Sequence, residues 1–163
     1  MNYLKIEKTS INNGPGVRVV LWVSGCSIHC KGCQNPDSWN LNVGKLFDDA
    51  AKQELFEALN KPYVRGITFS GGNPLENDNI NEISALCKEI KEKLPTKDIW
   101  LYTGYVFENI HSYLIMKYID VLVDGPYIEE QRDITLAFRG SRNQRLIDVK
   151  ETFKQNKIVT IQN

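Results

Sequence analysis

The sequence lacks the features that mark several broad classes of protein. No apolar run approaches the roughly 20 residues that are needed to cross a bilayer. The formal net charge is zero, because 20 basic side chains balance 20 acidic ones, and this argues against broad electrostatic binding to nucleic acid. The two histidines, His29 and His111, show no pairing with a serine and an aspartate that would indicate a hydrolytic triad. We therefore expect neither a membrane nor a nucleic acid among the partners.

Internal repeats, low-complexity tracts and proline- or serine-rich linkers are also missing. The chain has 163 residues, of which 42% are hydrophobic and 25% charged, a composition typical of a globular protein with an ordinary core. A single domain spanning residues 1–163 is the simplest organisation for this length. The N-terminus does not resemble a secretory signal peptide, so we expect a reducing, cytoplasmic location in which thiols remain free.

Cysteine is scarce but clustered, and this cluster is the main functional signal. Three of the four cysteines, Cys26, Cys30 and Cys33, have the spacing C-x3-C-x2-C. Thiolates so close together in the chain can all face one soft metal ion or one iron–sulfur cluster. A four-iron cluster normally takes four thiolates, whereas this loop offers three. The fourth cysteine, Cys87, lies far downstream in a segment of helical periodicity. The spacing therefore indicates a cluster with one iron open to another ligand.

Other uses of these cysteines are weighed against the cluster. Cys26, Cys30 and Cys33 together with His29 would make a structural zinc site of the three-cysteine, one-histidine kind. Neighbouring side chains tend to point apart, however, so convergence of His29 and Cys30 on one ion would require a contorted loop. Zinc ligands also usually come as two separated pairs, and no second pair exists here. Cys87 is most simply a small buried side chain, although it would close the open site if it bound the fourth iron.

Apolar, β-branched runs alternate with segments of helical periodicity along most of the chain. This alternation predicts βαβ units and an α/β fold with a mainly parallel sheet. A closed eight-stranded barrel normally needs about 250 residues, so we expect an open, partial (β/α) barrel. In the third helix Phe107, Ile110 and Leu114 should face the core. We predict strands at residues 3–8 (an edge strand), 17–23, 64–69, 99–102, 120–124, 146–149 and 158–161, with helices at 47–59, 80–94 and 107–116 and a brief helix or turn before the last strand.

The loops that follow the predicted strands lie on one rim and are rich in glycine. Right-handed crossovers place the loops that follow parallel strands on a single rim, which is where α/β proteins bind ligands. The cysteine loop begins at this rim, directly after the strand at residues 17–23. Glycines occur in four of these loops: Gly25, Gly71–Gly72, Gly104 and Gly125.

The cysteines and their flanks resemble those of a known family. C-x3-C-x2-C is the signature of the radical S-adenosylmethionine enzymes. The lead-in Asn13-Gly14-Pro15-Gly16-Val17-Arg18 and the tail Cys33-Gln34-Asn35 are similar to those of the glycyl-radical-enzyme activases. With a Gly-Gly-Asn-Pro segment downstream, the resemblance extends from residue 13 to about residue 145. It also implies an open, partial barrel.

The resemblance implies an activity, two cofactors and two partners. In this family three cysteines hold one 4Fe–4S cluster, and S-adenosylmethionine occupies the fourth iron. Its reductive cleavage yields methionine and a 5′-deoxyadenosyl radical, which in the activases removes a hydrogen atom from a partner's glycine. The short chain, with one cluster motif, resembles the activases of anaerobic ribonucleoside-triphosphate reductase. The implied partners are the glycine-bearing loop of that reductase and an external one-electron donor, while a homodimer or a stable complex with the reductase remain open.

The resemblance also suggests residues for S-adenosylmethionine. Gly71-Gly72-Asn73-Pro74 is similar to the family's Gly-Gly-Glu-Pro segment, which binds the methionine amino group, with Asn73 in place of the glutamate. Glycines without a Cβ allow backbone carbonyls to approach an ammonium closely. Thr103 and Asp124, with their neighbours Gly104, Tyr105 and Gly125, lie at later strand ends and are predicted contacts to ribose or adenine. Ordinary turn chemistry is the alternative for each.

Several further residues have alternative roles. Arg18 belongs to the lead-in motif, or it simply pairs with a carboxylate. Arg139, Arg142 and Arg145 form a basic stretch that could grip a carboxylate of S-adenosylmethionine or an acidic partner surface, or remain in solvent. Gly32 departs from the family, which often has an aromatic residue before the third cysteine, so another group should cover that side of the cluster.

Two rival functions remain at this point. One is a radical enzyme that acts on a small molecule, as in the formation of modified nucleobases, and it predicts an enclosed substrate pocket. The other is a non-catalytic iron–sulfur or zinc module for electron transfer or structure. That module predicts four protein ligands and no cleavage of S-adenosylmethionine. The Gly-Pro-Gly-Val-Arg lead-in favours the activase.

Overall fold

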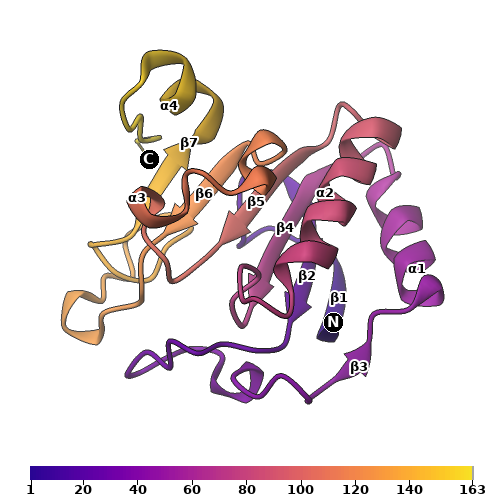
Figure 1. The fold of residues 1–163 in the computed structure, drawn as a ribbon, viewed down its shortest axis with the longest axis horizontal. Coiled ribbons are helices and arrows are strands. Elements are labelled where there is room, and N and C mark those ends of the chain that lie inside the picture. Colours follow the sequence, from indigo (N-terminus) through magenta and orange to yellow (C-terminus); the bar gives the residue numbers. More distant parts are fainter. Residues whose placement is uncertain (163) are drawn as a thin grey trace.

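A curved, seven-stranded sheet organises the computed structural model, which describes residues 1–162 (Figure 1). The central strands β2, β4, β5 and β6 are parallel, and β1, β3 and β7 pair antiparallel to their neighbours. The predicted α/β class with a mainly parallel, open sheet is thereby confirmed. In sheet order the strands are β3 (Lys45–Leu46), β1 (Asn2–Ser10), β2 (Val17–Val23), β4 (Val64–Gly71), β5 (Asp98–Tyr102), β6 (Val121–Asp124) and β7 (Arg145–Asp148).

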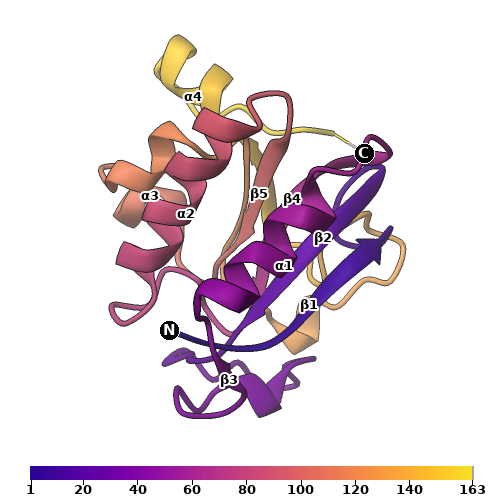
Figure 2. The same cartoon turned by 90° about the vertical axis from the view of Figure 1, so that its right-hand side faces the viewer.

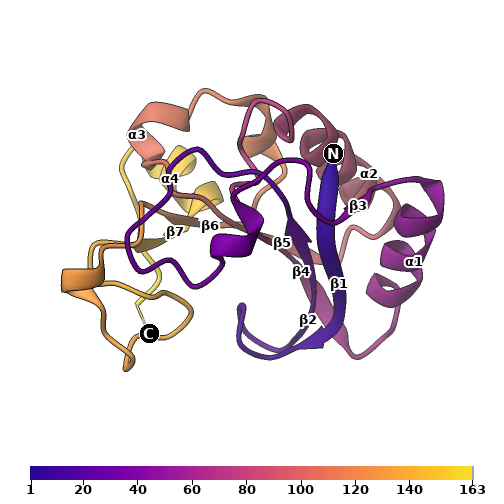
Figure 3. The same cartoon turned by 90° about the horizontal axis from the view of Figure 1, so that it is seen from below.

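Helices cover the convex side of this sheet (Figures 2 and 3). They are α1 (Asp49–Leu59), α2 (Ile80–Lys93), α3 (Phe107–Ile110) and α4 (Val149–Gln155), the last following directly on β7. The Asp48 side chain accepts a hydrogen bond from the Ala51 amide at 2.9 Å and so begins α1 as a capping residue. Apolar residues of α1 and α2 pack on alternate residues of the strands, such as Leu21 and Phe69, to form the main core. No helix within residues 1–162 is both long and apolar enough to cross a membrane.

The structure departs from the predicted elements in three places. The helix predicted at 107–116 breaks after Ile110, and a separate 3₁₀ turn follows at Leu114–Lys117. The break resets the helical phase, so Leu114 is 72% exposed, while Ile115 takes the buried position that Leu114 was predicted to hold. The strand predicted at 158–161 is only an isolated bridge between Thr160 and Ile147. The predicted edge strand, β1, has β3 outside it, but only at its first two residues.

The concave side of the sheet has a different chemistry. Strand residues alternate between the two faces, so the neighbours of the core residues point to the concave side. Trp100 and Val123 form a small second apolar cluster there, joined by the partly buried Tyr102 and Phe138. Loops, rather than helices, lie along this side of the arc (Figure 3). The concave side is therefore the open side of the partial barrel.

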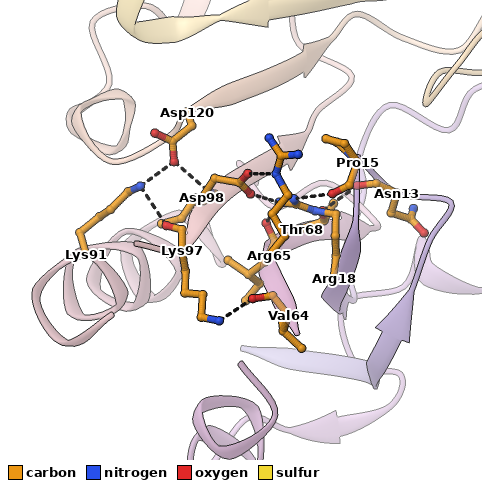
Figure 4. Close-up of polar contacts among 12 residues, drawn as sticks. Asn13, Pro15, Arg18, Val64, Arg65, Thr68, Lys91, Lys97, Asp98 and Asp120 are labelled. Atoms are coloured by element: carbon orange, nitrogen blue, oxygen red, sulfur yellow. Dashed lines mark hydrogen bonds and ion pairs between the residues drawn. The ribbon is translucent and has the colours of Figure 1, made fainter. Parts of the chain in front are cut away.

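A fully buried arginine joins three strands at the N-terminal end of the sheet (Figure 4). The Arg18 guanidinium meets Asp98 Oδ1 at 2.6 Å and donates to Thr68 Oγ1 and the Ile67 carbonyl, both at 2.8 Å. It also lies over the Trp100 ring, 5.4 Å from its centroid. Burial lowers the pKa of Arg18, and the hydrogen bond and charge of Asp98 oppose that shift. Arg18 therefore pairs with a carboxylate, the structural alternative that the sequence had left open.

Gly14 of the lead-in makes room for this arginine. A Cβ on Gly14 would lie 2.8 Å from Cδ of Arg18, and Gly14 and Gly16 both have positive φ angles. The Thr68 hydroxyl donates to the Asn13 carbonyl at 2.7 Å and ties the turn to β4. Because Arg18 is at the start of β2 and the cysteine loop follows its end, Arg18 acts on the site only through the sheet.

We predict that Arg18→Leu destabilises the protein by about 3–5 kcal/mol, because it leaves the Asp98 charge without its buried partner. Arg65→Leu is the matched control: Arg65 Nε contacts the same carboxylate at 3.0 Å, but its side chain is 57% exposed. For this exposed pair we expect a loss below about 1 kcal/mol. Urea unfolding of the reduced, iron-free protein measures both, and equal losses would contradict the assigned role of Arg18.

Candidate functional site

The cysteines lie in a long loop, residues 24–44, that crosses the C-terminal ends of the parallel strands (Figures 1 and 3). The loop is closed by its own backbone: the Gly25 amide donates to the Ser38 carbonyl at 2.7 Å, and the Cys26 amide to the Trp39 carbonyl at 3.1 Å. The Ser24 amide donates to the Asn2 carbonyl at 3.0 Å. The loop therefore has a defined shape and is attached to the sheet at its base.

A cavity of about 120 Å³ at this end of the sheet, the cluster cavity, collects most of the predicted site residues. All three loop cysteines line it, as do residues from the ends of β4, β5 and β6. Pro74 and Asp124, although predicted as cofactor contacts, do not line it. The predicted residues that do are Cys26, Cys30, Cys33, Gly71, Gly72, Asn73, Thr103, Gly104 and Gly125.

The three thiols are half-buried, as groups that face a cavity should be. Burial raises the pKa of the Cys30 thiol, the Tyr127 amide acts against this shift, and Cys26 and Cys33 raise the pKa further. Thiolates rather than thiols bind metals, so loading of the site must release protons. The Asn35 amide donates to Cys33 Sγ at 3.3 Å. Such bonds to a ligand sulfur favour its thiolate form and tune iron–sulfur clusters.

The arrangement suits a cluster better than a single ion. Within residues 1–162, no three histidine, cysteine or acidic side chains converge closely enough to hold one metal ion. His29 instead stacks on Trp39 with its ring centroid 4.4 Å away, so it does not join the cysteines as the zinc alternative requires. The buried Trp39 Nε1, at the cavity wall, has no hydrogen-bond acceptor among the residues that the structure describes. A cluster that presents sulfur at several corners fits three separated thiols and such a free donor.

Cys87 lies elsewhere. It is fully buried on α2, within the main core, and is not part of the cavity wall. Burial raises the pKa of its thiol far above the ordinary value. The structure therefore gives no support to Cys87 as a fourth ligand.

The glycine loop after β4 touches the cysteine loop backbone to backbone. The Gly72 amide donates to the Val23 carbonyl and the Asn73 amide to the Gly25 carbonyl, both at 2.8 Å. A Cβ on Gly72 would lie 2.4 Å from the Gly25 carbonyl oxygen, a distance that no side chain tolerates. Glycine is required here by close approach of the chain itself.

Asn73 connects three strand-end loops through its side chain. It is 1% exposed, and its amide oxygen accepts from the Thr103 hydroxyl at 2.8 Å. Its amide nitrogen donates to Glu76 Oε1 at 3.3 Å. The same oxygen of Glu76 accepts from the amide and the hydroxyl of Ser27, at 2.9 and 2.8 Å. Glu76 thus links the glycine loop to the residue that follows Cys26.

This geometry explains the neutral residue at position 73. A glutamate there, as in the family's usual segment, would present a carboxylate to Glu76 and lose the amide donor. Like charges at such a distance repel, particularly where the side chains are partly desolvated. Asn73 and Glu76 therefore act as a hydrogen-bonded pair, in which the carboxylate lies in the turn that follows the segment.

Another segment covers the side of the cysteine loop at Gly32. The Glu129 carboxylate packs where a Cβ of Gly32 would be, and Lys31 forms ion pairs with Glu129 at 3.2 Å and Glu130 at 3.3 Å. Tyr127, just before this segment, lines the cluster cavity. The segment lies on the side of the loop where the missing aromatic residue led us to expect a covering group, and its cover of a cluster stays a prediction.

The Asp124 carboxylate binds other groups of the protein. Its carboxylate is buried, accepts from the Phe107 amide at 2.8 Å and pairs with Arg145, which also binds Glu108 at 2.8 Å. The hydrogen bond from Arg145 lowers the pKa of Glu108 to about 2. The role of Asp124 as a ribose contact stays a prediction, and the geometry favours support of the loop at Gly125 instead.

Sequence reasoning did not select several residues of this site. Trp39, Ser70, Tyr102 and Gln144 line the cavity, and Glu76 supports it from behind. None lies in a recognised motif, because each reaches the site through the fold. The one available signal was Glu76, an acidic residue shortly after a Gly-Gly-Asn-Pro segment that lacks the usual glutamate.

We predict that Gly72→Ala sharply lowers the iron and sulfide bound on anaerobic reconstitution, since the backbone collision separates the two loops at a cost of about 1–3 kcal/mol. Gly104→Ala is the control in the same cavity. Its Cβ would meet only the terminal Cδ1 of Ile28, which can rotate away. Comparable iron contents in the two variants would contradict the importance of the Gly25–Gly72 contact.

Glu76→Ala should speed the loss of iron to a chelator several-fold, because the acceptor that ties Ser27 to Asn73 disappears. Glu76→Gln retains an oxygen acceptor and should lie much closer to the wild type. The measurement is the rate of iron release, followed by absorbance under anaerobic conditions. An alanine variant that releases iron as slowly as the wild type would show that this link does not hold the loop.

Comparisons with known proteins agree with this site. The family model described as a 4Fe-4S single cluster domain matches residues 12–147. The anaerobic ribonucleoside-triphosphate reductase-activating protein of Enterobacteria phage T4 is 47% identical over 146 residues, which cover 90% of this chain and 93% of that protein. The proteins of the same name from Haemophilus influenzae and Escherichia coli K12 are 42% and 38% identical over 148 residues, covering 88% of this chain and 96% of each relative.

Identity of this extent over nearly the whole length, together with a cavity that gathers the three cysteines and the glycine loop, settles the family. The chain belongs to the radical S-adenosylmethionine enzymes with a 4Fe–4S single-cluster domain, in the family of the anaerobic ribonucleoside-triphosphate reductase-activating proteins.

Proposed function

We propose that this protein is an iron–sulfur activase that cleaves S-adenosylmethionine reductively and generates a glycyl radical on anaerobic ribonucleoside-triphosphate reductase. The observation that carries the proposal is the cluster cavity, where the C-x3-C-x2-C loop and the glycine loop after β4 face the same space. The relatives named above, which are activating proteins of that reductase, support the choice of partner.

In this proposal Cys26, Cys30 and Cys33 hold one 4Fe–4S cluster as thiolates. With Cys87 enclosed in the core, one iron is left for S-adenosylmethionine. The bound cluster supplies the electron that cleaves S-adenosylmethionine to methionine and the 5′-deoxyadenosyl radical. The protein contributes position, exclusion of side reactions and electrostatics.

The other predicted site residues take supporting parts. Gly71, Gly72 and Asn73 form the wall on which the methionyl end rests, and Thr103 holds Asn73 in place. Pro74 and Asp124 act behind the wall, as parts of the turns that carry it.

The partners follow from the shape of the fold. A glycine on another protein must come close to the cluster, and the open, concave side of the partial barrel supports entry of such a loop (Figure 3). An external donor must supply one electron per turnover. We also propose that residues 1–163 work as one domain, because the strands of residues 1–162 form a single sheet. We propose a cytoplasmic location, where thiols stay reduced and available to iron.

Anaerobic reconstitution with iron and sulfide, followed by S-adenosylmethionine and dithionite, should yield 5′-deoxyadenosine from the wild type and none from Cys26→Ala. With the reductase present, electron paramagnetic resonance should show a glycyl radical on the partner. Cleavage without a glycyl radical on the reductase would leave a radical enzyme with another substrate. A fully loaded wild-type protein that produces no 5′-deoxyadenosine would refute the proposal.

A further inference from the structure

A second cavity adjoins the cluster cavity and continues along the concave side of the sheet. It has a volume of about 380 Å³, within the usual range of small-molecule pockets, roughly 300–1,000 Å³. The two cavities are therefore neighbours, and a group that lines the second one lies beside the space that the cysteines face. The residues common to both linings are Gln34, Asn35, Ser70, Tyr102 and Gln144.

Among the described residues, 1–162, only Arg139 brings a charged side chain to the lining of these two cavities. The second cavity is bordered mainly by side-chain amides and aromatic rings, such as Asn13, Trp22 and Phe138, and by Arg139. Apart from the cysteine thiols, the cluster cavity is lined by neutral residues alone. Arg139 is therefore the one positive charge that residues 1–162 present to a ligand there.

Arg139 also has hydrogen-bonding capacity to spare. Its Nη1 donates to the Gln144 carbonyl at 2.9 Å, whereas its buried Nε has no acceptor. Among residues 1–162 it forms no ion pair, although its charge contributes to lowering the pKa of Asp133. The other two arginines of this stretch differ: Arg145 is paired with Asp124 and Glu108, and Arg142 is exposed.

The backbone holds Arg139 in place at a conformational cost. Phe138, the preceding residue, has a φ of 59°, a left-handed conformation that is strained for a bulky side chain. The Tyr102 hydroxyl fixes it by donating to the Phe138 carbonyl at 2.6 Å, and the Phe138 ring packs edge-on against Trp100. On the other side, Gln144 Oε1 accepts from the Gly140 amide at 2.9 Å. The loop is thus built to present this residue.

We propose that Arg139 binds the carboxylate of S-adenosylmethionine. The inference rests on the proposed function, which puts that molecule in the cluster cavity. An arginine presents planar donors that match a carboxylate, and a desolvated, pre-positioned arginine does so with little further loss of entropy. S-adenosylmethionine has a single carboxylate, and within the described part of the chain Arg139 is the only cation that lines the two cavities.

The test is the binding of radiolabelled S-adenosylmethionine to reconstituted protein, measured by equilibrium dialysis without a reductant so that no turnover occurs. Arg139→Gln should bind roughly ten- to a hundredfold more weakly, with unchanged iron content. Arg142→Gln, which removes an exposed arginine of the same loop, should bind like the wild type.

Decarboxylated S-adenosylmethionine identifies the group that is recognised. The wild type should prefer the intact compound, and Arg139→Gln should reduce this preference by the same factor by which it weakens binding. Any affinity that the carboxylate gains from binding the iron is the same in both proteins, so it cancels when their preferences for the intact compound are compared. If Arg139→Gln does not fold, the same comparison is made with Arg139→Lys, which keeps the charge but loses the planar pair of donors and should fall in between.

Unchanged affinity in a fully loaded Arg139→Gln, or an unchanged preference for the intact compound, would overturn the inference. Normal affinity combined with loss of binding to the reductase would also overturn it and assign the anion to the partner. A loaded wild type that does not bind S-adenosylmethionine would refute the proposed function as well. Wild-type binding that Arg139→Gln does not alter refutes only the role of Arg139.

Discussion

The close backbone approach of Gly25 and Gly72 is the constraint on which the site depends. These residues follow β2 and β4, which are neighbouring parallel strands, and any side chain at Gly72 would strike the Gly25 carbonyl. The contact brings the cysteine loop and the glycine loop to one cavity. Hydrogen bonds through Asn73 and Glu76 then fix their relative position and extend the connection to Thr103 on β5.

The opposite end of the sheet contributes through stability. Arg18 is a fully buried cation that joins β2 to β4 and β5, and Gly14 of the lead-in leaves the space that its side chain occupies. A buried charge is tolerated only when its partners are held in place. The lead-in Asn13–Arg18 is the motif that pointed most specifically to an activase. Its Arg18 stabilises the fold, whereas its Asn13 borders the second cavity.

The sequence predicted the α/β class, most of the strands and the shared rim, because β-branched runs and helical periodicity are local patterns. It failed where tertiary contacts decide, as at Leu114, where a break in the helix exchanged the buried position with Ile115. It also failed at residues 158–161, an apolar run that meets β7 at a single bridge. Among the site residues, Pro74 was selected by its place in the Gly-Gly-Asn-Pro segment and Asp124 by its position at a strand end, and neither lines the cluster cavity.

By itself the sequence determined the chemistry of this protein: three thiols at a spacing that suits a cluster, a glycine loop for a close backbone contact, and a family. These properties are carried by neighbouring residues, so they can be read along the chain. Only the tertiary structure decided that Cys87 is enclosed in the core, that Glu76 supports the cysteine loop and that Arg139 faces the second cavity. Each of these depends on which strands are neighbours and on which side of the sheet a loop returns. Both features are set by contacts between residues that are far apart in the sequence.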